Sequence, residues 1–314
     1  MAPGRSTAMS ARVHAYLDET RLFSEAGDGQ PAGGNFLVRS GQLCAHVRRS
    51  PSKDTAGEDA LGVFRVGDRC WVLAVADGVG GQAGGRDAAL AALAAMGDAL
   101  ASIGGDPQRM RGAVLDGIER ANAAVLALGG GAATTLAVAE VGEEYIRPYH
   151  VGDSAVLLVG QRGRLKLQTV PHSPVGFAVE AGLLDATEAI HHELLHVISN
   201  VIGSADMRIE VGPELPFAAR DTLVLASDGL FDNLFVEEVV EAVRCGELGA
   251  AMGRLEGQVA ARMRGPAVHN GRLLPSKPDD LGVLLFRRHS PVSARDWRMH
   301  EPATRDWLST ADAC

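Results

Sequence analysis

The chain has few cysteines and few aromatic residues. Its 314 residues include four cysteines that lie far apart and form no CxxC pair: Cys44, Cys70, Cys245 and Cys314. This spacing favours reduced thiols over a disulfide framework or a zinc-thiolate site. Aromatic residues make up 4% of the chain, so alanine, valine and leucine must supply most of the core.

A long apolar run and an excess of positive charge are also missing. No segment reaches the ~18 consecutive apolar residues that a membrane-spanning helix needs, and no secretory leader is visible. The net charge of −9 opposes electrostatic binding to nucleic acid but does not disfavour metal ions. We therefore expect a cytoplasmic protein that binds neither membrane nor nucleic acid. No segment indicates an oligomeric state.

Turn residues are abundant by contrast, with 38 glycines in the chain. Strands are expected at 35–40, 43–48, 61–66, 70–77, 134–141, 145–152, 155–160, 165–170, 221–227 and 281–288. Helices are expected at about 11–22, 86–103, 107–128, 234–244 and 247–264. This order predicts an α+β fold in which two packed antiparallel β-sheets are flanked by pairs of helices on both sides (α-β-β-α). Residues 1–35 are expected to form a loosely ordered lead-in and residues 290–314 a peripheral tail.

The stretch WVLAVADGVGGQAGGRDAA, residues 71–89, permits two interpretations. Its glycines at Gly78 and Gly80, with Ala83, fit the fingerprint of a dinucleotide-binding loop. That fold requires one helix and then a parallel strand with an acid near its end, whereas two helices are expected to follow here back to back. The other interpretation is that Asp77, at the end of the predicted strand, holds a metal ion.

Acidic residues recur at the ends of predicted strands. Each of the following closes or directly precedes a strand: Glu58, Asp59, Asp77, Asp228, Asp279 and Asp280. Any one of them is compatible with a simple turn, because Asp-Gly is a common turn dipeptide. Their recurrence in one context favours convergence at one rim of a sheet sandwich, where cations would neutralise them. Oxygen ligands without cysteine select Mg²⁺ or Mn²⁺ over zinc.

Six segments in this order resemble the metal-dependent serine/threonine phosphatases of the protein phosphatase 2C type: GEDAL, VADGVGG, TTLAV, HVGDSAVLLV, LASDGLFDN and KPDDLGVLL. The resemblance covers about residues 43–288. It implies a catalytic domain over residues 36–289 that hydrolyses phosphoserine and phosphothreonine in partner proteins. It also implies two Mg²⁺ or Mn²⁺ ions as cofactors.

The resemblance implies direct metal ligands at four positions. Asp77 would bridge the two ions, and the carbonyl of Gly78 would contact one of them. Asp228 and Asp279 would ligate the other ion. Such a pair of ions lowers the pKa of a bridging water, which attacks phosphorus in line with the leaving group.

The remaining acids of the pattern are expected to act around the ions. Glu58 and Asp59 would hold metal-bound waters, and so they count with Asp77 as catalytic residues. Asp153, in the segment VGDS, and Asp280 are expected to support the ligands without touching a metal ion.

Three positions depart from the family pattern. Asp54 stands where an arginine usually holds the substrate phosphate, so Lys53 or Arg48 is the candidate phosphate contact. Gly130 stands where bacterial relatives often carry an aspartate for a third metal ion, which puts that site in doubt. Ala155 follows VGDS in place of arginine. These departures leave open a second hypothesis, a phosphatase-like regulatory or binding module with weak or no catalysis.

A third hypothesis comes from the segment HELLH, in which His192, Glu193 and His196 match the zinc-peptidase pattern HExxH. A helix over this segment would place both histidines on one face. The extended pattern with a further glycine and histidine is absent, so surface histidines are the simpler interpretation. Cysteine-based phosphatase chemistry is excluded, because no arginine lies six residues after any of the first three cysteines.

Overall fold

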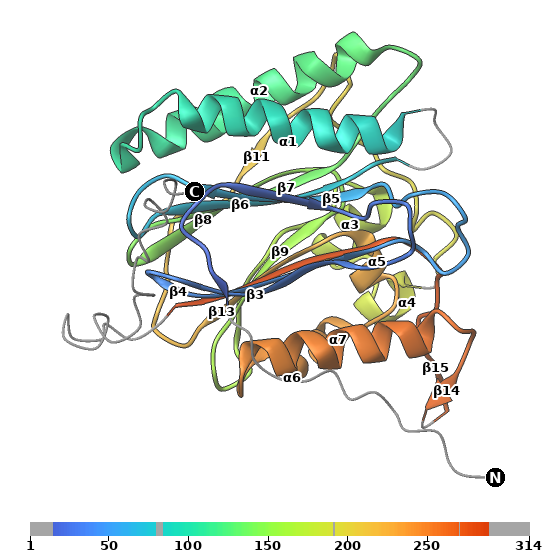
Figure 1. Cartoon of the computed structure of the whole chain (residues 1–314). Helices are drawn as coiled ribbons and strands as arrows, with labels where there is room; N and C mark the ends of the chain where they lie inside the picture. The colour runs from blue at the N-terminus through green and yellow to red at the C-terminus, as the bar shows by residue number, and fades with distance from the viewer. Residues whose placement is uncertain (1–14, 80–83, 191, 270, 289–314) are drawn as a thin grey trace, which may run out of the picture.

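Two β-sheets packed face to face form the centre of the protein, and helices cover both outer faces (Figure 1). The computed structural model describes residues 15–79, 84–190, 192–269 and 271–288. Each sheet has seven described strands, and these are antiparallel except where β1 (Ala15–Tyr16) pairs with β3 (Ala32–Val38). The predicted α+β fold of two antiparallel sheets between pairs of helices is confirmed.

The last strand of the chain lies in the middle of the first sheet. The strand order is β1-β3-β4-β16-β13-β9-β10. The strands not yet bounded are β4 (Gly41–Arg48), β9 (Ala155–Val159), β10 (Leu165–Gln168), β13 (Thr222–Ala226) and β16 (Leu281–Arg288). Because Ala226 pairs with Val283, the residues after β13 lie beside those before β16. This register brings Asp228 and Asp279 to one rim.

The second sheet delivers two more acids to that rim. Its order is β11-β8-β7-β6-β5-β2, with β12 also paired to β8. The bounds are β2 (Arg21–Ser24), β5 (Asp59–Arg65), β6 (Trp71–Asp77), β7 (Leu136–Val141), β8 (Tyr145–Val151), β11 (Glu210–Val211) and β12 (Leu215–Pro216). Asp59, the first residue of β5, is the register partner of Asp77, the last residue of β6.

Alternating side chains of β6 fill two separate cores. Trp71, Leu73 and Val75 point into the layer between the sheets, and Val72 and Ala74 point toward helices α1 (Gly85–Ala101) and α2 (Met110–Leu128). A third core joins the first sheet to α6 (Val236–Val243) and α7 (Leu248–Arg262). Since both faces of β6 are covered, its sequence is apolar up to Asp77, as is typical of a central strand.

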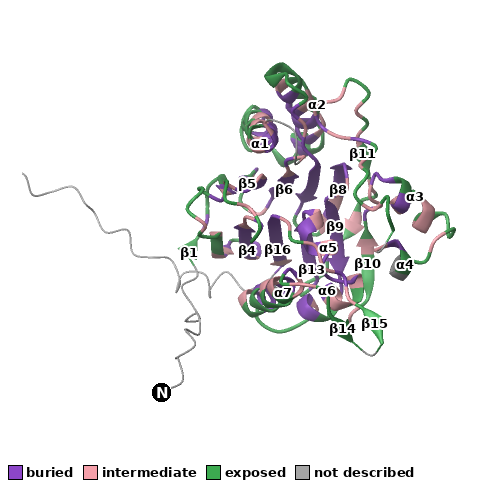
Figure 2. Cartoon of the chain, turned by 90° about the vertical axis from the view of Figure 1, so that its right-hand side faces the viewer, coloured by how far each residue is buried: buried purple, intermediate pink, exposed green. Residues whose placement is uncertain are grey.

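Short elements cluster on one side of the molecule (Figure 2). They are α3 (Pro174–Glu180), α4 (Ala186–Ala189) and the hairpin of β14 (Val268–His269) and β15 (Arg272–Leu273). The helix α5 (Asp228–Phe231) directly follows β13. Among the described residues, no helix is long and apolar enough to cross a membrane.

Two expectations about the start of the chain are wrong. The helix expected at about 11–22 is not formed by the described residues, because β1 and β2 occupy 15–16 and 21–24. Residues 15–35 are not a loosely ordered lead-in, since β2 and β3 pair with β5 and β4. The extended backbone of β2 places Phe23 in the core between the sheets, where its ring lies 5.6 Å from that of Phe36. Residues 1–14 and the tail at 290–314 lie outside the described residues.

Gly229, in α5, packs against the start of β16 with no room for a side chain. A Cβ at this position would lie 1.8 Å from the carbonyl oxygen of Asp280. We expect Gly229→Ala to lower the free energy of unfolding by about 2 kcal/mol or more, because the backbone has to shift. Gly253→Ala is the matched control, since its Cβ meets nothing within 4 Å and alanine favours a helix by about 1 kcal/mol. Urea unfolding measures both, and equal stabilities would contradict the expectation.

Candidate metal centre

Eight carboxylates from both sheets and the adjoining loops gather at one rim, and we call them the acid cluster: Glu58, Asp59, Asp77, Asp153, Asp228, Asp232, Asp279 and Asp280. The structure therefore brings together all seven acids that the sequence singled out, and it adds Asp232 as the eighth. Gly78, the other predicted ligand, can contribute only its backbone carbonyl. Every member either forms a hydrogen bond with another member or lies close enough for its charge to shift the pKa of another member. The acids thus form one electrostatic unit.

Ser227 ties the two sheets together inside the acid cluster. Its hydroxyl donates to Oδ2 of Asp59 at 2.6 Å and accepts from the backbone N–H of Gly282 at 3.0 Å. Ser227 also directly precedes Asp228, the first residue of α5. The relative position of Asp59 and Asp228 is therefore set by a buried hydrogen bond between the sheets.

The motif TTLAV holds the backbone of Asp77. The carbonyl of Asp77 accepts from the N–H of Thr135 and from the hydroxyl of Thr134, both at 2.8 Å. The N–H of Asp77 donates to Thr135 Oγ1 at 3.2 Å. These contacts fix the end of β6, so the carboxylate of Asp77 projects from a rigid position.

Gly78 is packed tightly, though against protein. The resemblance implied that the carbonyl of Gly78 contacts a metal ion. A Cβ on Gly78 would lie 2.3 Å from the carbonyl oxygen of Gly85, in the first turn of α1. The close approach of α1 is therefore sufficient to require glycine. Gly80 and Ala83, which completed the dinucleotide fingerprint, lie outside the described residues.

Desolvation and mutual repulsion raise the pKa of several members of the acid cluster. Desolvation raises the pKa of Asp77 well above its usual value, and the charges of Asp59 and Asp228 add to the shift. The pKa of Asp59 rises to about 8, mainly through burial and then through Asp280. The pKa of Asp153 rises to about 6, through burial and then the charge of Asp232. The cluster therefore holds more negative charge than its own surroundings neutralise.

Among the solvent-shielded oxygen atoms of the acid cluster, two have no hydrogen-bond partner in the described part of the chain. They are Oδ1 of Asp59 and Oδ1 of Asp153, and both are shielded from solvent. A shielded carboxylate oxygen without a partner is costly unless an ion or ordered water satisfies it. Because all the donors are hard oxygen atoms, the residues fit Mg²⁺ or Mn²⁺.

Lys53 lies within the acid cluster, whereas Arg48 does not contact it. The ammonium of Lys53 is 2.5 Å from Glu58 Oε2 and 2.8 Å from Asp280 Oδ2. The guanidinium of Arg48 instead contacts the sulfur of Met263, the residue directly after α7. Asp280 also accepts from the backbone N–H of Glu58 at 2.7 Å. Asp280 and Lys53 together therefore fix the loop that carries Glu58.

Lys277 and Asp232 are residues that the sequence reasoning missed. The ammonium of Lys277 lies 2.8 Å from Asp228 Oδ2, 2.8 Å from Asp232 Oδ2 and 2.7 Å from Asp279 Oδ2. Burial alone would lower the pKa of Lys277, but these three carboxylates raise it. The signals were present, since Asp232 is one helical turn after Asp228 and Lys277 begins the motif KPDD.

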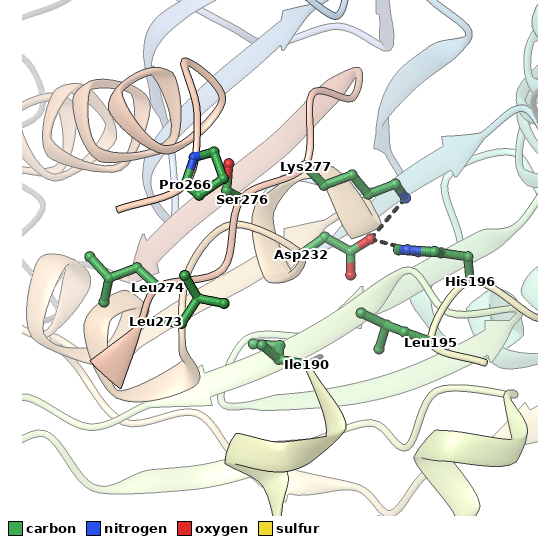
Figure 3. Close-up of a pocket in the computed structure, with 9 residues that line it drawn as sticks. All are labelled: Ile190, Leu195, His196, Asp232, Pro266, Leu273, Leu274, Ser276 and Lys277. Atoms are coloured by element: carbon green, nitrogen blue, oxygen red, sulfur yellow. Dashed lines mark hydrogen bonds and ion pairs between the residues drawn. The ribbon is translucent and has the colours of Figure 1, made fainter. Parts of the chain in front are cut away.

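His196 lies at the edge of the acid cluster, and the HELLH segment is not helical. Helix α4 ends at Ala189, and residues 193–196 form turns. The zinc-peptidase hypothesis is therefore wrong in its geometry, because HExxH places its ligands one turn apart on a helix. Nδ1 of His196 instead lies 3.4 Å from Asp232 Oδ2 (Figure 3). Burial opposes ionisation of Asp232, but His196 and Lys277 hold its pKa below the usual value.

Two adjoining cavities open beside the acid cluster. The smaller, of about 140 Å³, has apolar walls of Ile190, Leu195 and the hairpin residue Leu273, with Lys277 and Asp232 at its polar end (Figure 3). The larger, of about 320 Å³, also includes Ile190, Leu195 and Asp232 and reaches Asp153 and Asp228. A partly apolar depression therefore leads into the cluster.

A second group of potential metal ligands consists of His150, His172 and Glu210. Their side chains are engaged in hydrogen bonds and ring stacking within the protein. Nδ1 of His172 faces the N–H of Gly152 at 3.1 Å and the amide nitrogen of Asn200 at 2.9 Å. Because Nδ1 accepts these bonds, Nε2 carries the proton and donates to Glu210 at 3.0 Å. His150 stacks on His172 and bonds a backbone carbonyl. These contacts tie residues 171–208 to β8.

Comparisons with known proteins agree with the fold. A sequence model described as Protein phosphatase 2C matches residues 48–256, more than half of the chain. The serine/threonine phosphatase stp of Listeria welshimeri is 28% identical over 195 residues, which cover 59% of this chain and 76% of that protein. The serine/threonine phosphatase of S. agalactiae has a TM-score of 0.66 at 24% identity, over 79% of this chain and 99% of that one. The catalytic domain of PstP in complex with two manganese ions has a TM-score of 0.60 at 24% identity, over 79% and 98% of the two chains.

The raised pKa values predict that the metal-free protein loses stability as pH rises. Asp59 and Asp153, with pKa values of about 8 and about 6, bind protons more tightly folded than unfolded. Their contribution is fully present below the unfolded pKa of about 4 and is lost as pH rises through the folded values. The melting temperature of EDTA-treated protein should therefore fall between about pH 5 and pH 8.5, and Mn²⁺ should raise it more at the higher pH.

The substitution Asp59→Asn tests whether ionisation of Asp59 causes the loss of stability at higher pH. An amide at this position keeps an acceptor for Ser227 and removes the titrating charge, so the loss of stability with pH should become smaller. Asp116→Asn, at an exposed position of α2, is the matched control and should leave the pH dependence unchanged. An identical pH profile for wild type and Asp59→Asn would contradict the prediction.

Proposed function

Because the chain belongs to the protein phosphatase 2C family, we propose that its acid cluster hydrolyses phosphoserine and phosphothreonine in proteins. The matched family region contains most of the acid cluster, from Glu58 to Asp232. The Listeria relative, named as a serine/threonine phosphatase, supports the same reaction and substrate class. The manganese ions of the PstP structure support a divalent metal as cofactor.

One observation carries the proposal: carboxylates with raised pKa values surround two oxygen atoms that have no partner in the described residues. Two divalent cations bound there would supply an activated water and would offset charge on the phosphate oxygens. Asp77 is best placed to bridge them, since the charges of both Asp59 and Asp228 act on its carboxylate. Its rigid backbone would keep that bridging position constant during turnover.

The other acids divide into two groups around Asp77. We assign Asp228 and Asp279 to one ion and the Gly78 carbonyl to the other, as in the family pattern. Glu58 and Asp59 are proposed to orient bound water, and Asp59 already uses one oxygen atom for Ser227. This leaves its unpartnered Oδ1 to face the water.

Asp153 and Asp280 are proposed to support the ligands. Both oxygen atoms of Asp280 are occupied, by the N–H groups of Ser50 and Glu58 and by Lys53. A carboxylate so engaged holds a loop and has little capacity left for a cation. Asp153 has an unpartnered Oδ1 beside the larger cavity, so it is suited to receive a water molecule.

The phosphate contact that replaces the usual arginine is proposed to be Lys53. Its side chain is partly exposed, with 28% of its surface accessible, so a phosphate can approach the ammonium while Glu58 and Asp280 hold it. Arg48 is a weaker candidate, because its guanidinium is directed to Met263. The depression lined by Ile190, Leu195 and Leu273 offers room for the residues that flank the phosphorylated side chain.

The central test is phosphate release from a phosphothreonine peptide by metal-depleted protein. Addition of Mn²⁺ or Mg²⁺ should start hydrolysis, and EDTA should stop it. Asp77→Asn should lower kcat by at least about a hundredfold, because an amide cannot hold two cations and charge stabilisation at phosphorus is lost. The variant should stay folded, since it removes one of the repelling charges.

Asp116→Asn serves as the control and should keep wild-type turnover. Near-normal metal-dependent activity of Asp77→Asn would place the reaction elsewhere. The substitution of the usual arginine by Asp54 favours one alternative, a regulatory or binding module. Tight binding of the phosphopeptide without turnover at any metal concentration would support that module instead.

A further inference from the structure

Lys277 occupies a position that a metal ion would also seek. Its ammonium contacts one oxygen atom of each of Asp228, Asp232 and Asp279 at 2.7–2.8 Å. Two of these three, Asp228 and Asp279, are the residues proposed above to ligate one divalent ion. Figure 3 shows the long side chain of Lys277 reaching toward Asp232 from the wall of the smaller cavity. A single positive charge is thus shared by three carboxylates.

The backbone fixes Lys277 in this place. The side chain of Asn233, which is fully buried, accepts from the N–H of Lys277 at 3.0 Å and donates to its carbonyl at 2.8 Å. The same amide group also donates to the carbonyl of Gly229 at 2.9 Å. Asn233 therefore links the backbone of Lys277 to α5, the helix that begins with Asp228. This link keeps the ammonium of Lys277 close to the acid cluster.

The residue type is also informative. Only three lysines occur among the 30 lysine and arginine residues of the chain, namely Lys53, Lys166 and Lys277. Two of the three contact the acid cluster. An ammonium is a compact point charge, whereas a guanidinium is a planar fork with five donors. A compact cation can be surrounded by several carboxylate oxygens in the way that a metal ion is.

We propose that Lys277 is a built-in cation that competes with a divalent metal ion for Asp228 and Asp279. The inference rests on the proposed two-metal function. It adds a reason why the two metal ions would bind with unequal affinity. Without metal, Lys277 offsets the repulsion among the three carboxylates and lets this part of the cluster form. A divalent ion that binds to Asp228 and Asp279 has to displace the ammonium or tolerate its charge nearby, and both weaken binding.

If Lys277 instead assisted metal binding, its removal would change the metal affinity in the opposite direction. All three contacts of Lys277 are to Oδ2 atoms, and a lysine that only oriented the carboxylates would leave their Oδ1 atoms for the metal. An orienting lysine would strengthen metal binding, and its removal would weaken it. A competing lysine weakens metal binding, and its removal strengthens it. The sign of the change in affinity therefore decides between them.

The test is a Mn²⁺ titration of the metal-depleted full chain, with free Mn²⁺ measured by its electron paramagnetic resonance signal. Lys277→Met keeps most of the side-chain length and removes the charge. It should lower the dissociation constant of the more weakly bound Mn²⁺ by roughly tenfold or more. In EDTA, the same variant should melt at a lower temperature than wild type, because three carboxylates lose their counter-ion.

Two further variants separate charge from structure. Lys277→Arg keeps the positive charge and should not tighten Mn²⁺ binding. Lys166→Met is the matched control, because Lys166 also pairs with a buried carboxylate, Asp221, but at the other end of β13 from the acid cluster. It should leave both Mn²⁺ dissociation constants unchanged. If Lys277→Met does not fold without metal, Lys277→Gln, which keeps a hydrogen-bond donor, gives the same comparison.

The outcomes separate this inference from the proposed function. If wild type binds two Mn²⁺ ions and Lys277→Met binds them with unchanged or weaker affinity, the competition is overturned while the two-metal function stands. If neither protein binds Mn²⁺, the proposed function fails and the competition fails with it. Tighter binding in Lys277→Met alone, with Lys166→Met and Lys277→Arg like wild type, supports the inference.

Discussion

Repulsion among carboxylates at one rim of the sheet sandwich is the constraint on which the site depends. Several of these acids have raised pKa values because desolvation and neighbouring charges act in the same direction. Such an arrangement is stable only with a compensating interaction, and the structure supplies three kinds. The hydroxyl of Ser227 bonds Asp59, backbone N–H groups bond Asp280, and two lysines contact the outer acids.

The sheet topology converts distant sequence segments into this single rim. Asp59 and Asp77 meet because β5 and β6 pair in antiparallel register, and the ends of β13 and β16 meet for the same reason in the other sheet. The bond from Ser227 to Asp59 then joins the two sheets at that point. The apolar layer between the sheets keeps them at a constant separation. The geometry of the site therefore depends directly on the packing of the core between the sheets.

The sequence predicted much of this because its signals are local. Strands with β-branched residues that end in an acid and a glycine marked Asp77 and Asp228 correctly as rim residues. It missed what depends on side-chain reach, since Lys277 joins three acids only after α5 and the loop before β16 are in place. The HELLH segment shows the reverse error, because a helix-compatible pattern forms turns here where Asp232 holds His196. Propensity is a weak guide where tertiary contacts decide.

The acid cluster also has parts that contact a lysine and parts that do not, and these parts differ in how much negative charge is left for a metal ion to offset. Lys53 partly offsets the charge of Glu58 and Asp280, and Lys277 partly offsets the charge of Asp228, Asp232 and Asp279. The central residues Asp59, Asp77 and Asp153 have no lysine contact in the described part of the chain, and two of them carry the unpartnered oxygen atoms. In the arrangement proposed above, a divalent ion at this centre would meet the shielded oxygen atoms without having to displace a lysine. The second ion, on the flank of Asp228 and Asp279, would have to compete with the ammonium of Lys277.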